Sequence, residues 1–295
     1  MGEIPNSQLK TSLTKINVAF FTALHLAAML AFLPQFFSWS AVGVMFFLYW
    51  VTASLGICLG YHRYLTHRSF EIPKWLGYFF AFCGALACEN GPCKWVAQHR
   101  MHHAHSDQPL DPHSPLRGFF WAHFGWMVYR NHYDDPKKIA EYSKDLQADA
   151  FYRFLDNHYL KLQVALGFVL FAMGGWSFVI WGIFVRMVVV YHSTWFVNSA
   201  AHIWGYRNVK LKDDLATNCW WVGLMAWGEG WHNNHHAFPS SAKHGLRWWE
   251  LDLTWAAIYF LKVLGLAKNI KVAQLQRGGD AGEKYFTGEV VKQTA

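Results

Sequence analysis

The sequence predicts an all-α membrane protein with four transmembrane helices in two hairpins and a cytoplasmic helical cap that carries a di-metal histidine site. Three observations lead to this prediction. The 295 residues are 53% hydrophobic and only 15% charged, whereas a typical soluble domain carries about 25% charged residues. Four apolar runs reach the roughly 20 residues that a membrane span requires. Histidines also recur in clusters at helical spacing, each cluster beside an apolar run.

The first hairpin is expected to consist of residues 16–33 and 39–59. The loop between these runs, residues 34–38, contains no lysine or arginine, whereas Arg63 and Arg68 follow the second run. Positively charged residues are enriched on the cytoplasmic side of membrane proteins. We therefore expect the tip of the hairpin outside the membrane and both of its ends in the cytoplasm.

The second hairpin is expected to consist of residues 162–180 and 181–201, with Gly174 and Gly175 at its tip. Between the hairpins, residues 76–87 are apolar but too short to span, and residues 95–105 are predicted to form a helix. Asp134-Asp135-Pro136 is a helix start signal. A further helix is expected near residues 255–264. We predict one domain, residues 1–275, and a polar, disordered tail, residues 276–295.

The histidine clusters predict a metal site. On a helix, positions i, i+3 and i+4 share one face, and neutral imidazole is the commonest metal ligand in proteins. A catalytic zinc ion takes three protein ligands, so nine histidines suit two metals with four or five ligands each. An all-histidine site suits iron, copper or zinc. The candidate ligands are His62, His67, His99, His102, His103, His202, His232, His235 and His236.

Other polar residues receive plainer interpretations. The five cysteines form no CxxC pair, so we expect buried free thiols in a reducing compartment. Glu89 and Glu229 are expected to accept hydrogen bonds from ligand imidazoles, and His105 and His113 can do likewise. The net charge of +7 suits a cytoplasmic membrane face rather than nucleic acid. The remaining histidines are expected to be core, polar or interfacial residues: His25, His123, His132, His158, His192 and His244.

Three motifs resemble the histidine boxes of the integral-membrane fatty acyl desaturases. They begin at His62 (HRYLTH), His99 (HRMHH) and His232 (HNNHH). Asn198-Ser-Ala-Ala-His202 is also similar to that family, as are Asp111-Pro-His, Arg117-Gly-Phe-Phe and Glu229-Gly-Trp-His. The resemblance covers residues 40–270. It is closest to the Δ9 group, particularly the bacterial and cyanobacterial acyl-lipid type.

The resemblance implies an O2-dependent enzyme that introduces a cis double bond, at Δ9 of a saturated C16 or C18 acyl chain, at a non-haem di-iron centre. It implies that the nine histidines bind the two irons and that Asn198 approaches one iron through water. It also implies an external electron donor, with ferredoxin favoured and a cytochrome b5-like protein as the alternative. The enzyme is then a multi-pass protein of a bacterial plasma or thylakoid membrane, with its active site on the cytoplasmic side.

A saturated chain has no polar handle near its middle, so an apolar tunnel must fix the position of the reaction. Candidate tunnel residues are Phe46, Trp50, Trp95, Trp195, Trp227 and Trp231. Animal acyl-CoA desaturases carry an Arg-Asp pair where this chain has Ala97 and Gln98. This difference favours an acyl group esterified to membrane lipid over acyl-CoA as substrate.

Three other functions remain open at this stage. A lipid hydroxylase or ketolase would use the same di-iron site. A membrane zinc hydrolase would need a general base beside the metal, as in HExxH, and the sequence has no such motif. A non-catalytic membrane protein that binds metal or haem would need only paired histidines, and nine clustered on one side of the membrane argue against it.

Overall fold

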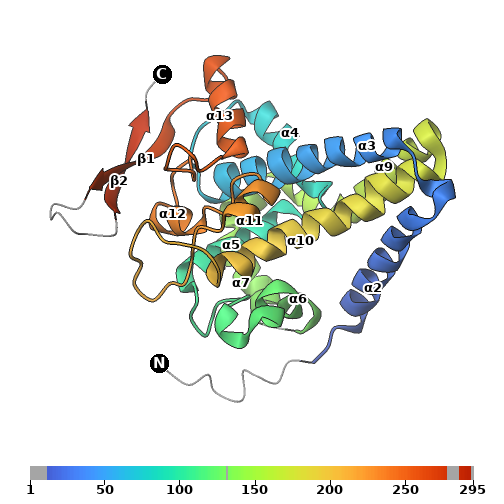
Figure 1. Cartoon of the computed structure of the whole chain (residues 1–295), viewed down its shortest axis with the longest axis horizontal. Coiled ribbons are helices and arrows are strands. Elements are labelled where there is room, and N and C mark those ends of the chain that lie inside the picture. The colour runs from blue at the N-terminus through green and yellow to red at the C-terminus, as the bar shows by residue number, and fades with distance from the viewer. Residues whose placement is uncertain (1–11, 131, 278–285, 294–295) are drawn as a thin grey trace.

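The computed structural model describes residues 12–130, 132–277 and 286–293, and most of them are helical. Figure 1 shows the long helices α3 (Trp39–Tyr49), α9 (Ala150–Val179) and α10 (Arg186–Asn198) extending together from a group of shorter helices. These long helices pack against one another along a shared core, and α2 (Lys15–Met29) lies beside them. Most of the nine clustered histidines lie on the shorter helices α5 (Pro92–His105) and α12 (His232–Ala237).

Within the described residues, three segments are long and apolar enough to cross a membrane: Lys15–Phe32, Trp39–Thr66 and Ala150–His202. Four were expected. The third segment is 53 residues long, and its backbone leaves the helical region at Gly174 and Gly175, where Gly175 has φ 64°. A left-handed φ costs glycine nothing. The break thus lies where the tip of the second hairpin was predicted. The other parts of these segments are η1 (Leu30–Phe32), the π-helices η3 (Trp50–Thr66) and η7 (Ile180–Val185), and the turn η8 (Ala200–His202).

The remaining helices are short and connect or cover the long ones. Several begin at a side-chain cap, as an isolated helix start requires. Asp135 accepts a hydrogen bond from the backbone N–H of Lys137, with Pro136 at the first helical position, which confirms the predicted start signal. These elements are η2 (Pro34–Phe36), α4 (Lys74–Ala85), α5 (Pro92–His105), η4 (Pro115–Arg117), η5 (Trp121–Gly125), α6 (Trp126–Val128), η6 (His132–Asp134), α7 (Pro136–Tyr142), α8 (Lys144–Gln147), α11 (Trp220–Met225), α12 (His232–Ala237) and α13 (Leu253–Val263).

Helix α4 packs closely against η3, the helix that carries the first two histidines. A Cβ atom on Gly56 would collide with the backbone of Cys83 and Gly84, and one on Gly60 would lie 3.0 Å from the carbonyl oxygen of Phe80. Glycine therefore allows the two helix backbones to touch. This contact fixes the position of His62, which lies farther along the same helix.

The C-terminal tail differs from the prediction of disorder for residues 276–295. Strands β1 (Ile270–Arg277) and β2 (Phe286–Gln293) form an antiparallel pair, and residues 278–285 and 294–295 lie outside the described part of the chain. Val272 lies opposite Val291, and β-branched residues favour such cross-strand pairing. Ile270 and Val272 are buried against the core beside α13. The prediction from overall polarity overlooked these valines.

The close contact of η3 with α4 predicts that Gly56→Ala destabilises the protein. Overpacking at a rigid backbone contact costs on the order of 1–3 kcal/mol, and the change acts on the helix that positions His62. We expect a lower thermal unfolding midpoint in detergent and a smaller folded yield. Gly43→Ala is the matched control, because a Cβ there meets nothing within 4 Å. Equal stability of the two variants would contradict the packing described here.

Candidate metal centre

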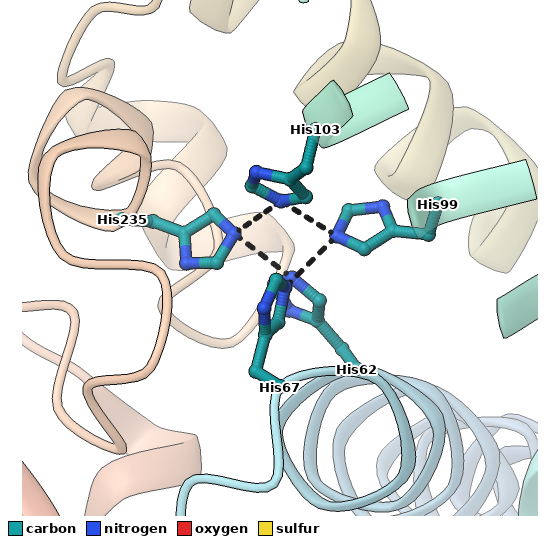
Figure 2. Close-up of side chains that lie close together, drawn as sticks. All are labelled: His62, His67, His99, His103 and His235. Carbon is teal, nitrogen blue, oxygen red and sulfur yellow. Dashed lines mark hydrogen bonds between the residues drawn. The ribbon is translucent and has the colours of Figure 1, made fainter. Parts of the chain in front are cut away.

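The nine predicted histidines converge in two adjacent groups. Five ring nitrogens in the first group, and four in the second, lie within 4.8 Å of one another. The first group contains His62, His67, His99, His103 and His235 (Figure 2). The second contains His102, His202, His232 and His236.

Each HxxHH triplet divides between the two groups, so neither triplet forms a half-shell for one metal. In α5, His99 and His103 point into the first group and His102 into the second. In α12, His235 joins the first group and His232 and His236 the second. Adjacent helical positions differ by about 100° in direction, which explains the division. The two short helices therefore lie face to face across both groups.

The Nε2 atoms of the first group face one another (Figure 2). The Nε2 atom of His235 lies 2.9 Å from that of His103 and 3.1 Å from that of His62. The Nε2 atom of His99 lies 3.1 Å from that of His103 and 3.2 Å from that of His67. In the second group, the Nε2 atom of His236 lies 3.0 Å from that of His232 and 3.3 Å from that of His102.

Carboxylates hold the opposite nitrogen of several rings. His102 Nδ1 bonds Asp111 at 3.0 Å, His202 Nδ1 bonds Asp107 at 3.0 Å and His236 Nδ1 bonds Asp214 at 2.7 Å. His62 Nδ1 lies 2.7 Å from Glu229 Oε2, as was expected for that glutamate. A carboxylate only accepts, so the hydrogen-bonded Nδ1 atoms of His102, His202 and His236 carry the proton, and their Nε2 atoms are directed into the second group. The carboxylate partners are Asp107, Asp111, Asp214 and Glu229.

This arrangement fits a bound metal ion in each group. Lone pairs that face one another at about 3 Å repel unless a cation lies between them, and the buried Nε2 of His202 has no hydrogen-bond partner. Histidine ligands that donate their other N–H to a carboxylate are typical of metal sites. The donor set is neutral nitrogen without thiolate, which suits iron, copper or zinc.

The pKa of several of these imidazoles lies well below the usual value. Burial disfavours the charged form of the ring, and positive charge on a neighbouring imidazole disfavours it further. This holds for His99, His103, His232, His235 and His236. Burial also acts on His102, but the carboxylates beside it, Asp111 first, leave its pKa raised. Neutral rings are the form that binds a metal ion.

The sequence around each ligand explains its placement. His62 and His67 are five residues apart, and the backbone N–H of His67 bonds the carbonyl of His62, which is the i→i+5 pattern of a π-helix. The wider turn brings both rings to one side. Helix α12 has only six residues, too few to be stable alone. Asn233 anchors it by accepting from the backbone N–H of Asn208 and Val209.

A buried ion-pair network lies behind the first group. Arg63 pairs with Glu229 and Asp252, both at 2.9 Å, and Glu229 also lies 3.1 Å from His244 Nδ1. The ring centroid of His244 lies 4.4 Å from that of His235. His244 is therefore part of the centre's surroundings, and our interpretation of it as an ordinary polar residue was wrong. Its place depends on partners distant in the chain, which spacing alone does not reveal.

A cavity of about 380 Å³ adjoins the first group, and its wall includes His99, His113 and Asn198. Of the predicted tunnel residues, Trp95 and Trp195 line it. Trp227 and Trp231 pack elsewhere, against Tyr49 and Trp249. Phe46 and Trp50 do not line this cavity and are 59% and 40% exposed, because they occupy the outer face of their helices.

Glu89 lines the same cavity and does not touch a ligand imidazole, contrary to expectation. It accepts hydrogen bonds from Thr194 Oγ1 at 2.7 Å and from Trp95 Nε1 at 3.2 Å. The Trp95 ring in turn stacks on His99, with centroids 5.1 Å apart. Burial without a cationic partner raises the pKa of Glu89 to about 7. The cavity wall beside the first group thus combines aromatic rings with a buried carboxyl group.

Comparison with known proteins now decides the family. The family model for fatty acid desaturases matches residues 37–259. The chain belongs to the fatty acid desaturase family. The match contains all nine clustered histidines, whereas α2 and the β-strands lie outside it.

Three relatives illustrate this membership. The chain is 58% identical over 257 residues to an sn-1 stearoyl-lipid 9-desaturase of Synechocystis, which covers 86% of this chain and 79% of the relative. It is 53% identical over 264 residues to the sn-1 stearoyl-lipid 9-desaturase of Anabaena variabilis, with 90% and 96% covered. It is 52% identical over 257 residues to an sn-2 palmitoyl-lipid 9-desaturase of Nostoc, with 86% and 89% covered.

Asp111→Asn is expected to weaken metal binding at the second group of this desaturase-family centre. The change removes the charge that holds the His102 ring and its tautomer, and loss of such a partner typically costs about 10–100-fold in metal affinity. Chelator competition on the purified protein measures the effect. Glu141→Gln, at an exposed position, is the matched control, and equal affinities of both variants would argue against the role of Asp111.

Glu89→Gln is expected to change the pH dependence of stability. The pKa of Glu89 is raised from 4.5 to about 7 in the folded protein, so the folded state binds more protons and this residue disfavours folding increasingly as the pH rises. The gain in unfolding midpoint of Glu89→Gln over wild type should grow between pH 4.5 and about 7 and level off above it. Thermal unfolding in detergent across this range is the measurement. A gain that shrinks with rising pH would contradict the environment described for Glu89.

Proposed function

We propose that this protein is a membrane-bound fatty acyl desaturase that introduces a cis double bond at Δ9 of a saturated C16 or C18 chain. The observation that carries the proposal is the convergence of nine imidazoles into two groups, within each of which the ring nitrogens lie within 4.8 Å of one another. Family membership and the stearoyl- and palmitoyl-lipid 9-desaturases among the relatives support the reaction and the chain lengths.

Two non-haem irons are the proposed cofactor. The five histidines of the first group would hold one iron and the four of the second would hold the other, with Asn198 approaching through water. An iron pair bound there would supply the activation of O2. In the overall reaction O2 accepts four electrons, two from the C–H bonds of the chain and two from an external donor, and leaves as two water molecules.

The protein's own residues would position the chain and exclude water. Trp95 and Trp195 line the cavity beside His99 and offer apolar surface to a saturated chain. The hydrogen bond from Trp95 to Glu89 and its stacking on His99 fix the ring in one orientation. A fixed wall of this kind sets which carbons lie beside the centre, and precise placement accounts for a large part of catalysis.

We further propose that residues 1–275 act as one unit with four spans. The glycine break in the segment Ala150–His202 supports two spans there. The basic flanks of the spans favour a cytoplasmic active site in a bacterial plasma or thylakoid membrane. Ferredoxin is the favoured electron donor, with a cytochrome b5-like protein as the alternative. Membrane glycerolipid is the favoured acyl carrier, in agreement with the names of the relatives.

Expression in a host that lacks unsaturated fatty acids tests the function. The wild-type protein should produce Δ9-unsaturated chains, located by gas chromatography and mass spectrometry. His235→Ala should abolish them while the protein still accumulates in membranes, because the His235 Nε2 atom lies within 3.1 Å of the Nε2 atoms of two other rings of the first group.

His158→Ala is the matched control and should retain full activity, since this half-buried ring bonds the carbonyl of Phe154 in its own helix. Hydroxylated or keto products instead of double bonds would show that the protein is a lipid hydroxylase or ketolase and not a desaturase. Full unsaturation by His235→Ala would remove that residue from the centre.

A further inference from the structure

The cavity beside the first group extends to the outer surface of the helix bundle. One side of this outer part is formed by α2, through Ile16, Asn17, Phe20 and Phe21. The opposite side includes Tyr159 and Leu160 of α9. Both helices belong to segments that are apolar and long enough to cross a membrane. The cavity therefore reaches from the metal centre to a place between two candidate spans.

The rim between these helices is apolar and exposed. Ile16 is 74% exposed, Phe20 is 37% exposed and Leu160 is 50% exposed. Large apolar side chains around an opening indicate an interaction site rather than a water-filled entrance. On membrane-spanning helices, such side chains face hydrocarbon.

Helix α2 presents most of its surface outward, and its Phe21 packs against Phe124, Tyr191 and Trp195. Only 11% of the segment Lys15–Phe32 is buried, against 50% and 28% of the most apolar stretches of the other two candidate spans. Within α2, Leu24 is the buried residue. Two polar contacts fasten its inner side. Asn17 donates to the carbonyl of Met127 at 2.7 Å, and His25 Nε2 lies 3.2 Å from His192 Nε2. Figure 1 shows α2 splaying away from α10 toward its N-terminal end. Elements with few buried contacts open at low cost.

The polar part of the cavity carries little positive charge. Among the described residues that line it, Lys94 is the sole lysine or arginine, and it pairs with Asp134 at 2.9 Å. A carrier with several phosphates would require unpaired cations there. Asn17 and Asn90 line the same region, and their amides suit the ester and hydroxyl groups of a lipid.

We propose that the opening between α2 and α9 is a lateral portal through which the acyl chain of a membrane glycerolipid enters the cavity directly from the bilayer. Moving an acyl chain through water exposes each of its CH2 groups to water, which is unfavourable, and a lateral path avoids this exposure. Ile16, Phe20 and Leu160 form the apolar rim of the portal. The inference rests on the proposed desaturase function and its glycerolipid carrier, and it adds the route by which the chain enters.

Blocking the rim chemically tests the portal. Leu160→Cys is reconstituted in vesicles of 1-stearoyl-2-oleoyl galactolipid and phosphatidylglycerol, and its desaturation rate is measured before and after reaction with pyrenyl maleimide. The five native cysteines are buried, and wild type treated in the same way corrects for them. Modification should lower the rate about tenfold, since it obstructs substrate entry.

Phe168→Cys is the matched control. Phe168 lies two turns farther along α9, is 73% exposed and does not line the cavity. Its modification should leave the rate unchanged. A modified Leu160→Cys protein that desaturates as fast as the unmodified one would overturn the portal.

A second readout separates the portal from the proposed function. A stearoyl glycerolipid with a mid-chain diazirine should label the cavity-wall segment around Thr194 and Trp195 in vesicles, and modification of Leu160→Cys should suppress this labelling. Labelling and suppression without any new double bond would support the portal and reject desaturation. If the protein desaturates the lipid but modification of Leu160→Cys does not change the labelling, the portal is rejected and the proposed function is retained.

Discussion

The structure depends on two kinds of contact made by buried imidazoles. The Nδ1 atom of several rings contacts a carboxylate, and the Nε2 atoms face those of neighbouring rings. Asp107, Asp111, Asp214 and Glu229 each hold a ring by Nδ1 and direct its Nε2 inward. The inward lone pairs are mutually repulsive in the absence of a cation. Such an arrangement of ring nitrogens suits a bound metal cation. The carboxylates supply negative charge to balance the cation, which neutral imidazoles do not.

Much of the surrounding structure holds these rings in place. Glycine contacts bring η3 against α4, the buried asparagines anchor the short helix α12, and Arg63 joins Glu229 to Asp252 at the base of α13. The long helices place this group at one end of an apolar bundle (Figure 1). The cavity then links the centre to the outer face of α2 and α9. Binding of an apolar chain and binding of metal thus occur at adjoining sites.

The sequence predicted the nine clustered histidines and the apolar helices because both depend on local spacing. It did not predict how the ligands are shared, since the division of His102 from His103 depends on the way α12 faces α5. Nor did it predict the contact of His244 with Glu229 or the bond of Glu89 with Thr194, which is 105 residues away in the chain. The π-helical geometry behind His62 and His67 and the pairing of Val272 with Val291 also depend on tertiary contacts. Local pattern identified the chemistry, and long-range packing determined its geometry.

Metal analysis combined with X-ray absorption spectroscopy tests the central claim most directly. The purified protein loaded with iron should contain two irons per chain, one for each histidine group, with a nearest shell dominated by imidazole nitrogen. A single iron per chain, or a shell dominated by carboxylate oxygen, would contradict the account.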